Sequence, residues 1–294
     1  MSVKAKFDAF LSNIQLTDRQ IEDAKTKHTA IRDVLQEAYY DWPYPATTSI
    51  LVGSYAKHTA ARPPTDVDIL FIMPSHRFSY YQGYAGNGPS RLLQDVKAVL
   101  QGKYPKTGMR GDGQVVVVSF ASGFGVEVVP VFASDKDGVY HTPDTHDGGS
   151  WKTTNPEAER SRIAESNRIS NSNTVHLIKM TKIWKHVCQV PLSSFPLELL
   201  AVAFLSRWEH CGKSSFYYDW MVRDFFQHML SRVNGWEIIP GVTEIYGYGD
   251  AWETKADAAL RRATKACEYE SGDKDDLATA EWVKIFGGFF TGQQ

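Results

Sequence analysis

Gly53-Ser54-Tyr55 and Asp66-Val67-Asp68 are the two segments from which we predict the fold. The segment Thr48-Ser49-Ile50-Leu51-Val52 before Gly53 predicts a short strand, which is followed by a glycine turn and one or two turns of helix. The second segment opens a strongly apolar strand at 67–73, which we expect to be buried in a sheet. Side chains two residues apart on a strand point to the same face, so Asp66 and Asp68 should project together.

The glycine turn has the composition of a phosphate cradle. Gly53 allows the backbone to turn tightly and to approach a phosphate, and the helix that follows offers free N–H groups to an anion. The Ser54 hydroxyl can donate to a phosphate oxygen. A Gly-Ser pair alone is usually an ordinary turn, but its position after a strand and before Asp66 strengthens the phosphate interpretation.

Carboxylates on an apolar strand are costly unless they are paired or bind a metal. Asp66 and Asp68 therefore predict a magnesium site, because magnesium prefers oxygen ligands and often shares them with substrate phosphates. Glu127, on the strand predicted at 125–132, is the candidate third ligand. Alone it would equally suit the rim of a sheet, but the aspartate pair favours the ligand interpretation.

The rest of the chain predicts an α+β protein. A capping box at 17–20 begins a long helix over 17–37, and the strands at 114–120 and 125–132 form an antiparallel pair joined around 121–124. The segments 75–89 and 137–155 are rich in turn-forming residues and predict surface loops. The chain then becomes mainly helical, with apolar periodicity at 175–187, 196–211, 219–233, 250–268 and 276–286.

The composition is that of a soluble globular protein with one large domain or two smaller ones. The chain has 294 residues, of which 43% are hydrophobic and 22% charged, and its net charge of -2 argues against a dedicated nucleic-acid binder. The three cysteines form no CxxC pair, and ordinary helix residues in a reducing compartment are favoured over zinc ligands. No apolar run is long enough for a membrane span and no signal core is present, so we expect a cytoplasmic protein.

Several segments resemble a known group of enzymes. The Gly53-Ser54 and Asp66-x-Asp68 pattern with a later acid resembles the DNA polymerase beta-type nucleotidyltransferase superfamily. The segments 53–60, 126–130 and 177–185 narrow the resemblance to the bacterial cGAS/DncV-like nucleotidyltransferases, or CD-NTases. The segment 193–200 also resembles the matching part of 2′-5′ oligoadenylate synthases. Beyond Leu205 the chain is similar only in being helical.

The resemblance implies a two-lobed architecture like that of oligoadenylate synthases and cGAS. A polymerase-beta-like mixed sheet with a long N-terminal helix would form a catalytic lobe over 1–150, and a helical bundle over 151–294 would close the nucleotide cleft. Such enzymes join ribonucleoside triphosphates, usually into cyclic di- or trinucleotides, and release pyrophosphate. Bacterial members act in CBASS antiphage defence, where the product activates a separate effector.

The resemblance also assigns residue roles. Asp66, Asp68 and Glu127 would hold two Mg²⁺ ions, with Mn²⁺ as a substitute. Gly53, with Ser54, Lys182 and Ser194, would bind the triphosphate, and Phe195 would stack on the donor base; without the resemblance, Lys182 would be an ordinary solvated lysine and Phe195 a core residue. This chain departs from the family pattern by having Glu127 where aspartate is common, and His58 where many relatives have glycine. Neither departure removes a required group.

The expected partners are ribonucleoside triphosphates, ATP foremost, and a separate effector that receives the product. A regulatory protein partner stays open, whereas a nucleic-acid activator is not expected. The alternatives are a linear oligoadenylate-type synthase, a transferase of single nucleotides, and a nucleotide-binding regulator without turnover. The intact Asp66, Asp68 and Glu127 argue against the regulator.

Overall fold

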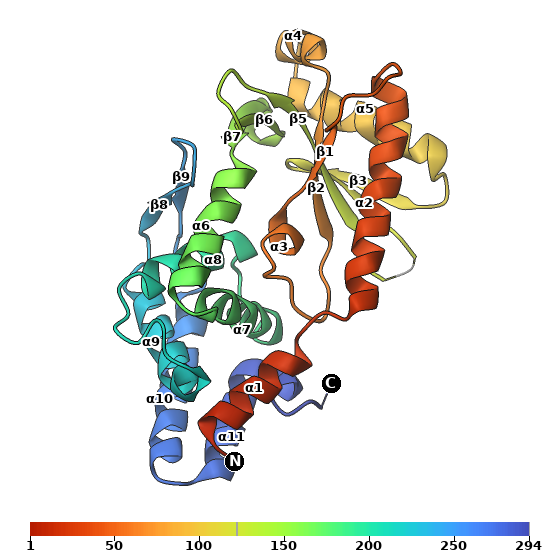
Figure 1. Cartoon of the computed structure of the whole chain (residues 1–294). Coiled ribbons are helices and arrows are strands. Elements are labelled where there is room, and N and C mark those ends of the chain that lie inside the picture. Colours follow the sequence, from red (N-terminus) through yellow and green to blue (C-terminus); the bar gives the residue numbers. More distant parts are fainter. Residues whose placement is uncertain (122, 294) are drawn as a thin grey trace.

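The computed structural model describes residues 1–121 and 123–293 of the chain. Figure 1 shows two lobes: one holds the sheet with α2 (Asp18–Tyr39) and α5 (Gly88–Lys103), and the other is helical. The capping box predicted at Thr17 is present, since its side chain accepts a hydrogen bond from the backbone N–H of Gln20 and the Gln20 side chain bonds the Thr17 N–H. The predicted fold class, a mixed sheet packed on a helical bundle, is confirmed.

The sheet places the sequence motifs side by side. Its strand order is β1-β2-β5-β4-β3, and β6 and β7 extend it from β5. β2 and β5 are parallel neighbours, and Asp68 lies opposite Glu127 in their register. β4 and β5 form the predicted antiparallel pair, although Ser122 in the predicted connection lies outside the described residues. The strands are β1 Ser49–Leu51, β2 Val67–Ile72, β3 Gly108–Asp112, β4 Val115–Ser119, β5 Val126–Ala133, β6 Tyr140–Asp144 and β7 Ser150–Thr154.

The second lobe is a helical bundle with one small ribbon, β8 (Trp236–Ile238) and β9 (Ile245–Gly247). Helix α8 is apolar on almost every side and lies in the centre of the bundle, as its sequence predicts. The helices are α6 Pro156–Ile169, α7 Asn173–Val187, α8 Ser194–Leu205, α9 Tyr218–Leu230, α10 Glu253–Ser271 and α11 Asp275–Phe286.

Two segments predicted as loops contain regular structure. The segment 137–155 forms the hairpin of β6 and β7, which was not predicted because the segment is rich in polar residues. Pro143 is tolerated in β6 because the pairing of β6 with β5 involves only Tyr140 and His141. The segment 75–89 contains a short helix, α4 (Phe78–Gln82), because Phe78 packs on Phe132 with ring centroids 4.9 Å apart. In both cases tertiary contacts override a turn-rich composition.

The first helix, α1 (Val3–Asn13), was not predicted and packs away from the sheet. Its buried side chains, Phe7 and Phe10 among them, belong to the apolar core of the helical lobe, whereas α2 packs in the core beneath the sheet. The N-terminal segment therefore spans both lobes (Figure 1). The domain bounds of 1–150 and 151–294 stay a prediction.

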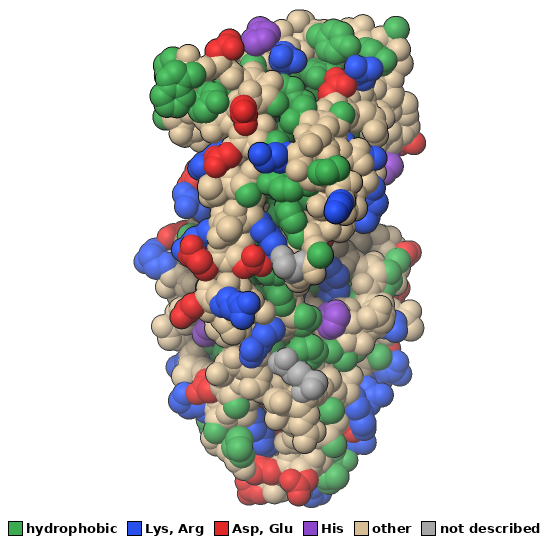
Figure 2. All heavy atoms as spheres, turned by 90° about the vertical axis from the view of Figure 1, so that its right-hand side faces the viewer, with side chains coloured by type: hydrophobic (Ala, Val, Ile, Leu, Met, Phe, Trp, Pro, Cys, Tyr) green, Lys and Arg blue, Asp and Glu red, His purple; other side chains and the backbone are tan. Residues whose placement is uncertain are grey.

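The surface is mixed in charge on the face shown in Figure 2, where basic and acidic side chains are interspersed over both lobes. Among the described residues, no helix combines the length and the apolar character that crossing a membrane requires.

Candidate active site

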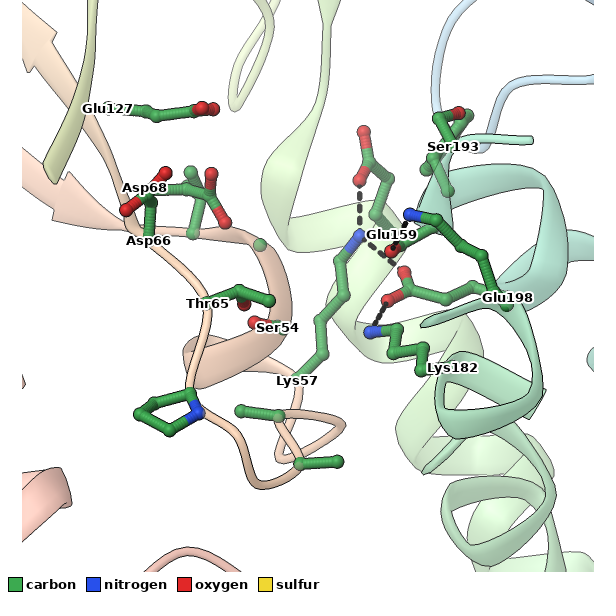
Figure 3. A pocket seen from close by; sticks show the side chains of 18 of the residues that line it. Ser54, Lys57, Thr65, Asp66, Asp68, Glu127, Glu159, Lys182, Ser193 and Glu198 are labelled. Carbon is green, nitrogen blue, oxygen red and sulfur yellow. Dashed lines mark hydrogen bonds and ion pairs between the residues drawn. The ribbon is translucent and has the colours of Figure 1, made fainter. Parts of the chain in front are cut away.

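A cleft of about 870 Å³ lies where the two lobes meet and contains every residue predicted to bind nucleotide or metal. The sheet lobe supplies the glycine turn and the carboxylates, and the helical lobe supplies α6, α7 and the start of α8. Figure 3 shows Asp66, Asp68 and Glu127 on one side of this cleft and Lys182 with Glu198 on the other. The predicted lining residues are Gly53, Ser54, Asp66, Asp68, Glu127, Lys182, Ser194 and Phe195.

The glycine turn is built around Asp68. Gly53 begins α3 (Gly53–Ala56) with a φ of +62°, and a Cβ atom at this position would lie 1.8 Å from Asp68 Oδ2. The N–H of Val52 donates to the Asp68 carbonyl oxygen at 2.9 Å, which ties the turn to β2. Only glycine satisfies both the left-handed backbone and the close approach of the carboxylate.

The three carboxylates lie at neighbouring strands: Asp66 immediately precedes β2, Asp68 is on β2 and Glu127 is on β5. Asp66 Oδ1 accepts a hydrogen bond of 2.7 Å from the backbone N–H of Gly125, just before β5. Burial, followed by the charge of Glu127, raises the pKa of Asp68 to about 7. Burial, followed by the charge of Asp66, also raises the pKa of Glu127. We name Asp66, Asp68 and Glu127 the acidic wall.

The acidic wall is electrostatically incomplete. In the described parts of the chain none of its members forms an ion pair with a lysine or arginine, and five carboxylates share the whole cleft with three lysines. A nucleoside triphosphate would add further negative charge, so the cleft requires additional cations. The all-oxygen donor set suits Mg²⁺. Over residues 1–121 and 123–293 no three metal-binding side chains converge on one point, and Asp66 is held by its backbone bond.

Lys182 lies on the opposite side, where its charge is already compensated. Its Nζ is 2.8 Å from Glu198 Oε1 and donates to Thr59 Oγ1 at 2.9 Å. Glu198 also pairs with Lys57, 3.0 Å from its Oε2. Burial acts to raise the pKa of Glu198, but Lys182 and Lys57 outweigh it and lower that pKa to about 2.

Lys57 completes this network by bridging the lobes. It follows the glycine turn and pairs with Glu159 on α6 at 2.7 Å, as well as with Glu198 on α8. Burial opposes the charged lysine, but the two glutamates hold the pKa of Lys57 above its usual value. We name Lys57, Lys182, Glu159 and Glu198 the paired wall (Figure 3).

Ser194 and Phe195 stand at the start of α8. Lys185 Nζ donates to Ser194 Oγ at 3.2 Å. The Phe195 ring is partly buried between Lys57, whose Nζ lies 5.3 Å from the ring centroid, and Tyr246, whose ring centroid is 5.7 Å away. Base stacking by Phe195 stays a prediction.

Sequence reasoning missed most of the paired wall. A signal existed for Glu198, because a lone acid within the apolar run of α8 needs a buried cation. Lys57 and Glu159 gave no such signal, since each reads as a solvated residue in a polar segment. The role of Gly125 in holding Asp66 was also missed. The structure requires glycine at this position, because a Cβ atom there would lie 2.6 Å from the Val118 carbonyl oxygen.

The three cysteines are free thiols in the structure. In the described chain, no group of three or more His, Cys, Asp or Glu side chains could hold an ion around them, and Cys188 instead contacts the carbonyl oxygens at the end of α11. Burial raises the pKa values of Cys188 and Cys267, which makes both thiols poor nucleophiles.

Comparison with known proteins places this geometry in context. Residues 1–167 match the model of the family described as "Second Messenger Oligonucleotide or Dinucleotide Synthetase domain" (SMODS). Over 312 aligned residues the chain is 25% identical to the "Cyclic AMP-AMP-AMP synthase" of an Acinetobacter species, covering 99% of this chain and 86% of that protein.

Two solved structures share the fold. The E. coli MS115-1 CdnC in a HORMA complex gives a TM-score of 0.71 at 19% identity and covers 98% of both chains. The Vibrio cholerae cyclic AMP-GMP synthase DncV, in complex with a linear intermediate, gives a TM-score of 0.74 at 14% identity and covers 95% of this chain and 93% of that one. The two-lobed arrangement is therefore that of the CD-NTases.

Proposed function

The chain belongs to the SMODS family of CD-NTase nucleotidyltransferases, and from this premise we propose that it joins ribonucleoside triphosphates into a cyclic di- or trinucleotide. The signal would serve CBASS antiphage defence. One observation carries the proposal: three carboxylates without cationic partners face a glycine-serine turn inside an interlobe cleft. This arrangement suits a substrate that brings phosphates and divalent cations together.

The acidic wall would hold two Mg²⁺ ions, with Mn²⁺ as a substitute. Bound there, the metal would neutralise charge on the reacting phosphate and on the departing pyrophosphate. The protein's own contribution is rigidity. The turn at Gly53 packs directly against the Asp68 carboxylate, so that side chain need not be ordered when substrate arrives, whereas Asp66, held by the Gly125 N–H, would shift toward the ions.

The glycine turn and the helical lobe would bind the nucleotide. Ser54 would donate its hydroxyl to the triphosphate, and Ser194 would do so from the start of α8. Lys182 would approach the phosphates without leaving Glu198, which keeps its ammonium in a fixed position. Phe195 would stack on the donor base. The hydroxyl of a second nucleotide would then attack the α-phosphate in line and expel pyrophosphate.

Product analysis tests the proposal most directly. The protein is incubated with all four ribonucleoside triphosphates, Mg²⁺ and Mn²⁺, then treated with phosphatase, and the products are identified by mass spectrometry. A phosphatase-resistant cyclic species is expected, and its mass gives the bases and the ring size together. The Asp66→Asn/Asp68→Asn protein serves as the matched control and should give none.

Other outcomes identify the alternatives. Consumption of triphosphates without a cyclic species would indicate a linear oligonucleotide synthase or a transferase of single nucleotides. That result would refute cyclisation. Triphosphate binding without consumption would indicate either a regulator that has lost turnover or a synthase that lacks its activating partner.

Two partners follow from the proposal. The cyclic product would act on a separate effector, and a regulatory protein would control the synthase. The second expectation is supported by the neighbour CdnC, which was solved as a HORMA complex. A nucleic-acid activator is not expected from a chain with a net charge of -2.

A further inference from the structure

Three lysines line the cleft, and they differ in how their charges are compensated. Lys57 pairs with Glu159 and Glu198, and Lys182 pairs with Glu198. Lys185 completes the set, but across residues 1–121 and 123–293 it has no ion pair with any carboxylate. The lysine that sequence reasoning selected is thus already paired, whereas its neighbour one helical turn further along α7 is not.

The position of Lys185 leaves its charge in an unfavourable place. Its partly buried side chain ends at the first turn of α8, where Nζ donates to Ser194 Oγ at 3.2 Å. The positive end of a helix repels a cation, and the N-cap residue Ser193 makes no capping hydrogen bond there. Burial, and then the charge of Lys182, lower the pKa of Lys185. An anion at this point would offset both the repulsion between Lys185 and the positive end of α8 and the cost of burying the lysine charge beside Lys182.

The geometry points to Lys185 as a phosphate-binding residue of this cleft, acting together with Ser194 on the triphosphate tail. This inference rests on the proposed function and assigns a role to a residue that had none in the sequence analysis. A cation without a carboxylate partner can give its full charge to a phosphate, because no internal pair has to be broken. Lys182, in contrast, shares its charge with Glu198.

His186 lies next to Lys185, is exposed, and also lines the cleft. The carboxylates of the cleft belong to other groups: Glu198 and Glu159 to the paired wall, and the remaining three to the opposite side (Figure 3). The triphosphate tail would therefore lie between the acidic wall with its metal ions and Lys185.

Nucleotide binding tests this assignment without relying on turnover. Dissociation constants are measured by calorimetry, in Mg²⁺, for AMP and for an ATP analogue that cannot be cleaved at the α-phosphate. Lys185→Met removes the charge but keeps the apolar stem, and should reduce the preference for the triphosphate over AMP by about tenfold or more. Lys185→Arg should restore most of that preference. AMP affinity should change little in either variant.

Lys179→Met is the matched control. Lys179 is on the same helix, is also a partly desolvated lysine, and donates to the Gln15 side chain at 2.8 Å instead of lining the cleft. Its removal should leave the triphosphate preference unchanged. Thermal unfolding of each variant checks the fold, and Lys185→Gln provides a second neutral side chain should the methionine variant not fold.

The results separate this inference from the proposed function. An unchanged preference in Lys185→Met or Lys185→Gln, or an equal loss in the Lys179 control, overturns the role of Lys185 while leaving the synthase proposal intact. If the unaltered protein shows no preference for the triphosphate over AMP, the proposed function fails, and this inference fails with it.

Discussion

The acidic wall and the paired wall face each other across one cleft but differ in how their buried charges are compensated. In the paired wall the charges are compensated internally: Glu198 accepts hydrogen bonds from Lys57 and Lys182, and also from Thr59. The acidic wall buries carboxylates side by side, and burial, followed by the charge of Glu127, raises the pKa of Asp68 to about 7. Buried charges that are compensated within the protein are typical of a structural network, whereas buried charges without partners are typical of a ligand-binding site.

This difference predicts that substitutions in the two walls have different effects. Changes in the acidic wall should abolish activity while leaving the fold intact or more stable, because they remove repulsion. Changes in the paired wall should weaken the fold, because they leave buried charges without partners. Variants that reverse this pattern would contradict the division.

The largest effect is expected from Asp66→Asn with Asp68→Asn. Synthesis should fall to background, while the melting temperature at pH 8 should stay the same or rise because two crowded carboxylates become neutral. Adding Mg²⁺ should raise the melting temperature of the unaltered protein but not that of the variant. Activity assays and thermal unfolding with and without Mg²⁺ measure both effects.

Asp33→Asn is the control for this pair. Asp33 lies exposed on α2, and within residues 1–121 and 123–293 its one ion pair is with its neighbour Arg32, so its variant should match the unaltered protein in both assays. If the Asp66→Asn/Asp68→Asn variant still synthesises product, the acidic wall is not required for the reaction.

The next effect is on stability, from Glu198→Gln. The amide keeps the shape but leaves two buried lysines with reduced compensation, so we expect a loss of about 3–5 kcal/mol in the free energy of unfolding. Denaturant unfolding at pH 7 gives the value. Glu165→Gln, which removes an exposed carboxylate paired with Arg168, should cost less than about 1 kcal/mol.

The pH dependence sharpens this prediction. Glu198 has a folded-state pKa of about 2, below its ordinary value of 4.5, so it stabilises the fold fully above pH 4.5 and progressively less as the pH falls toward 2. The stability difference between the unaltered protein and Glu198→Gln should shrink over that window. A difference that stays constant from pH 6 to pH 2 would mean that the paired wall does not act through its charges.

A smaller loss of stability is expected from Gly53→Ala, which tests the support of the acidic wall. The left-handed backbone and the contact with Asp68 Oδ2 should cost about 1–3 kcal/mol. Displacement of that carboxylate should lower the rate of synthesis by about 10²-fold. Gly102→Ala on α5, where a Cβ meets nothing within 4 Å, should instead stabilise the fold by about 0.5–1 kcal/mol. Full activity in Gly53→Ala would show that Asp68 does not depend on the turn.

The two walls also mark what could be predicted from the sequence. The aspartates of the acidic wall are local: Asp66 immediately precedes β2, Asp68 lies on it, and strand periodicity aligns their side chains. Glu127 is distant in the chain, on β5, and was predicted because it is a lone acid on an apolar strand and the aspartate pair favours a third ligand. The fold class followed from the strands and helices predicted along the whole chain and from the family resemblance. The long helix α2 was predictable because its capping box lies within four residues.

The paired wall could not be predicted because its partners are distant in the chain. Lys57 meets Glu159 and Glu198 only after α6 and α8 have packed against the sheet lobe. The same holds for α1, whose burial depends on the last helices of the chain, and for the β6–β7 hairpin, whose turn-rich composition concealed its pairing. Sequence reasoning thus recovered the residues that carry a motif or a family resemblance, distant ones included, and missed the ion pairs that form only when the two lobes pack together.

The smallest effect is expected from His58→Gly. His58 lies between Lys57 of the paired wall and Thr59, which also donates a hydrogen bond to Glu198. His58 has a φ of 57°, and its left-handed conformation lets Lys57 and Thr59 on either side both reach Glu198. Because the side chain is exposed, its backbone conformation dominates the effect. His58→Gly should stabilise the fold by up to about 1 kcal/mol, the relieved strain being offset in part by the greater entropy of unfolded glycine.

His58→Val supplies the opposing variant, since a β-branched residue is strongly disfavoured at positive φ and should cost about 1–3 kcal/mol. The order of stability should therefore be glycine, histidine, valine, measured by denaturant unfolding. In the Glu198→Gln background the penalty of valine should shrink, because the turn then no longer has to bring Lys57 and Thr59 onto a carboxylate. If His58→Val costs the same free energy of unfolding in both backgrounds, the left-handed conformation at His58 does not depend on the paired wall.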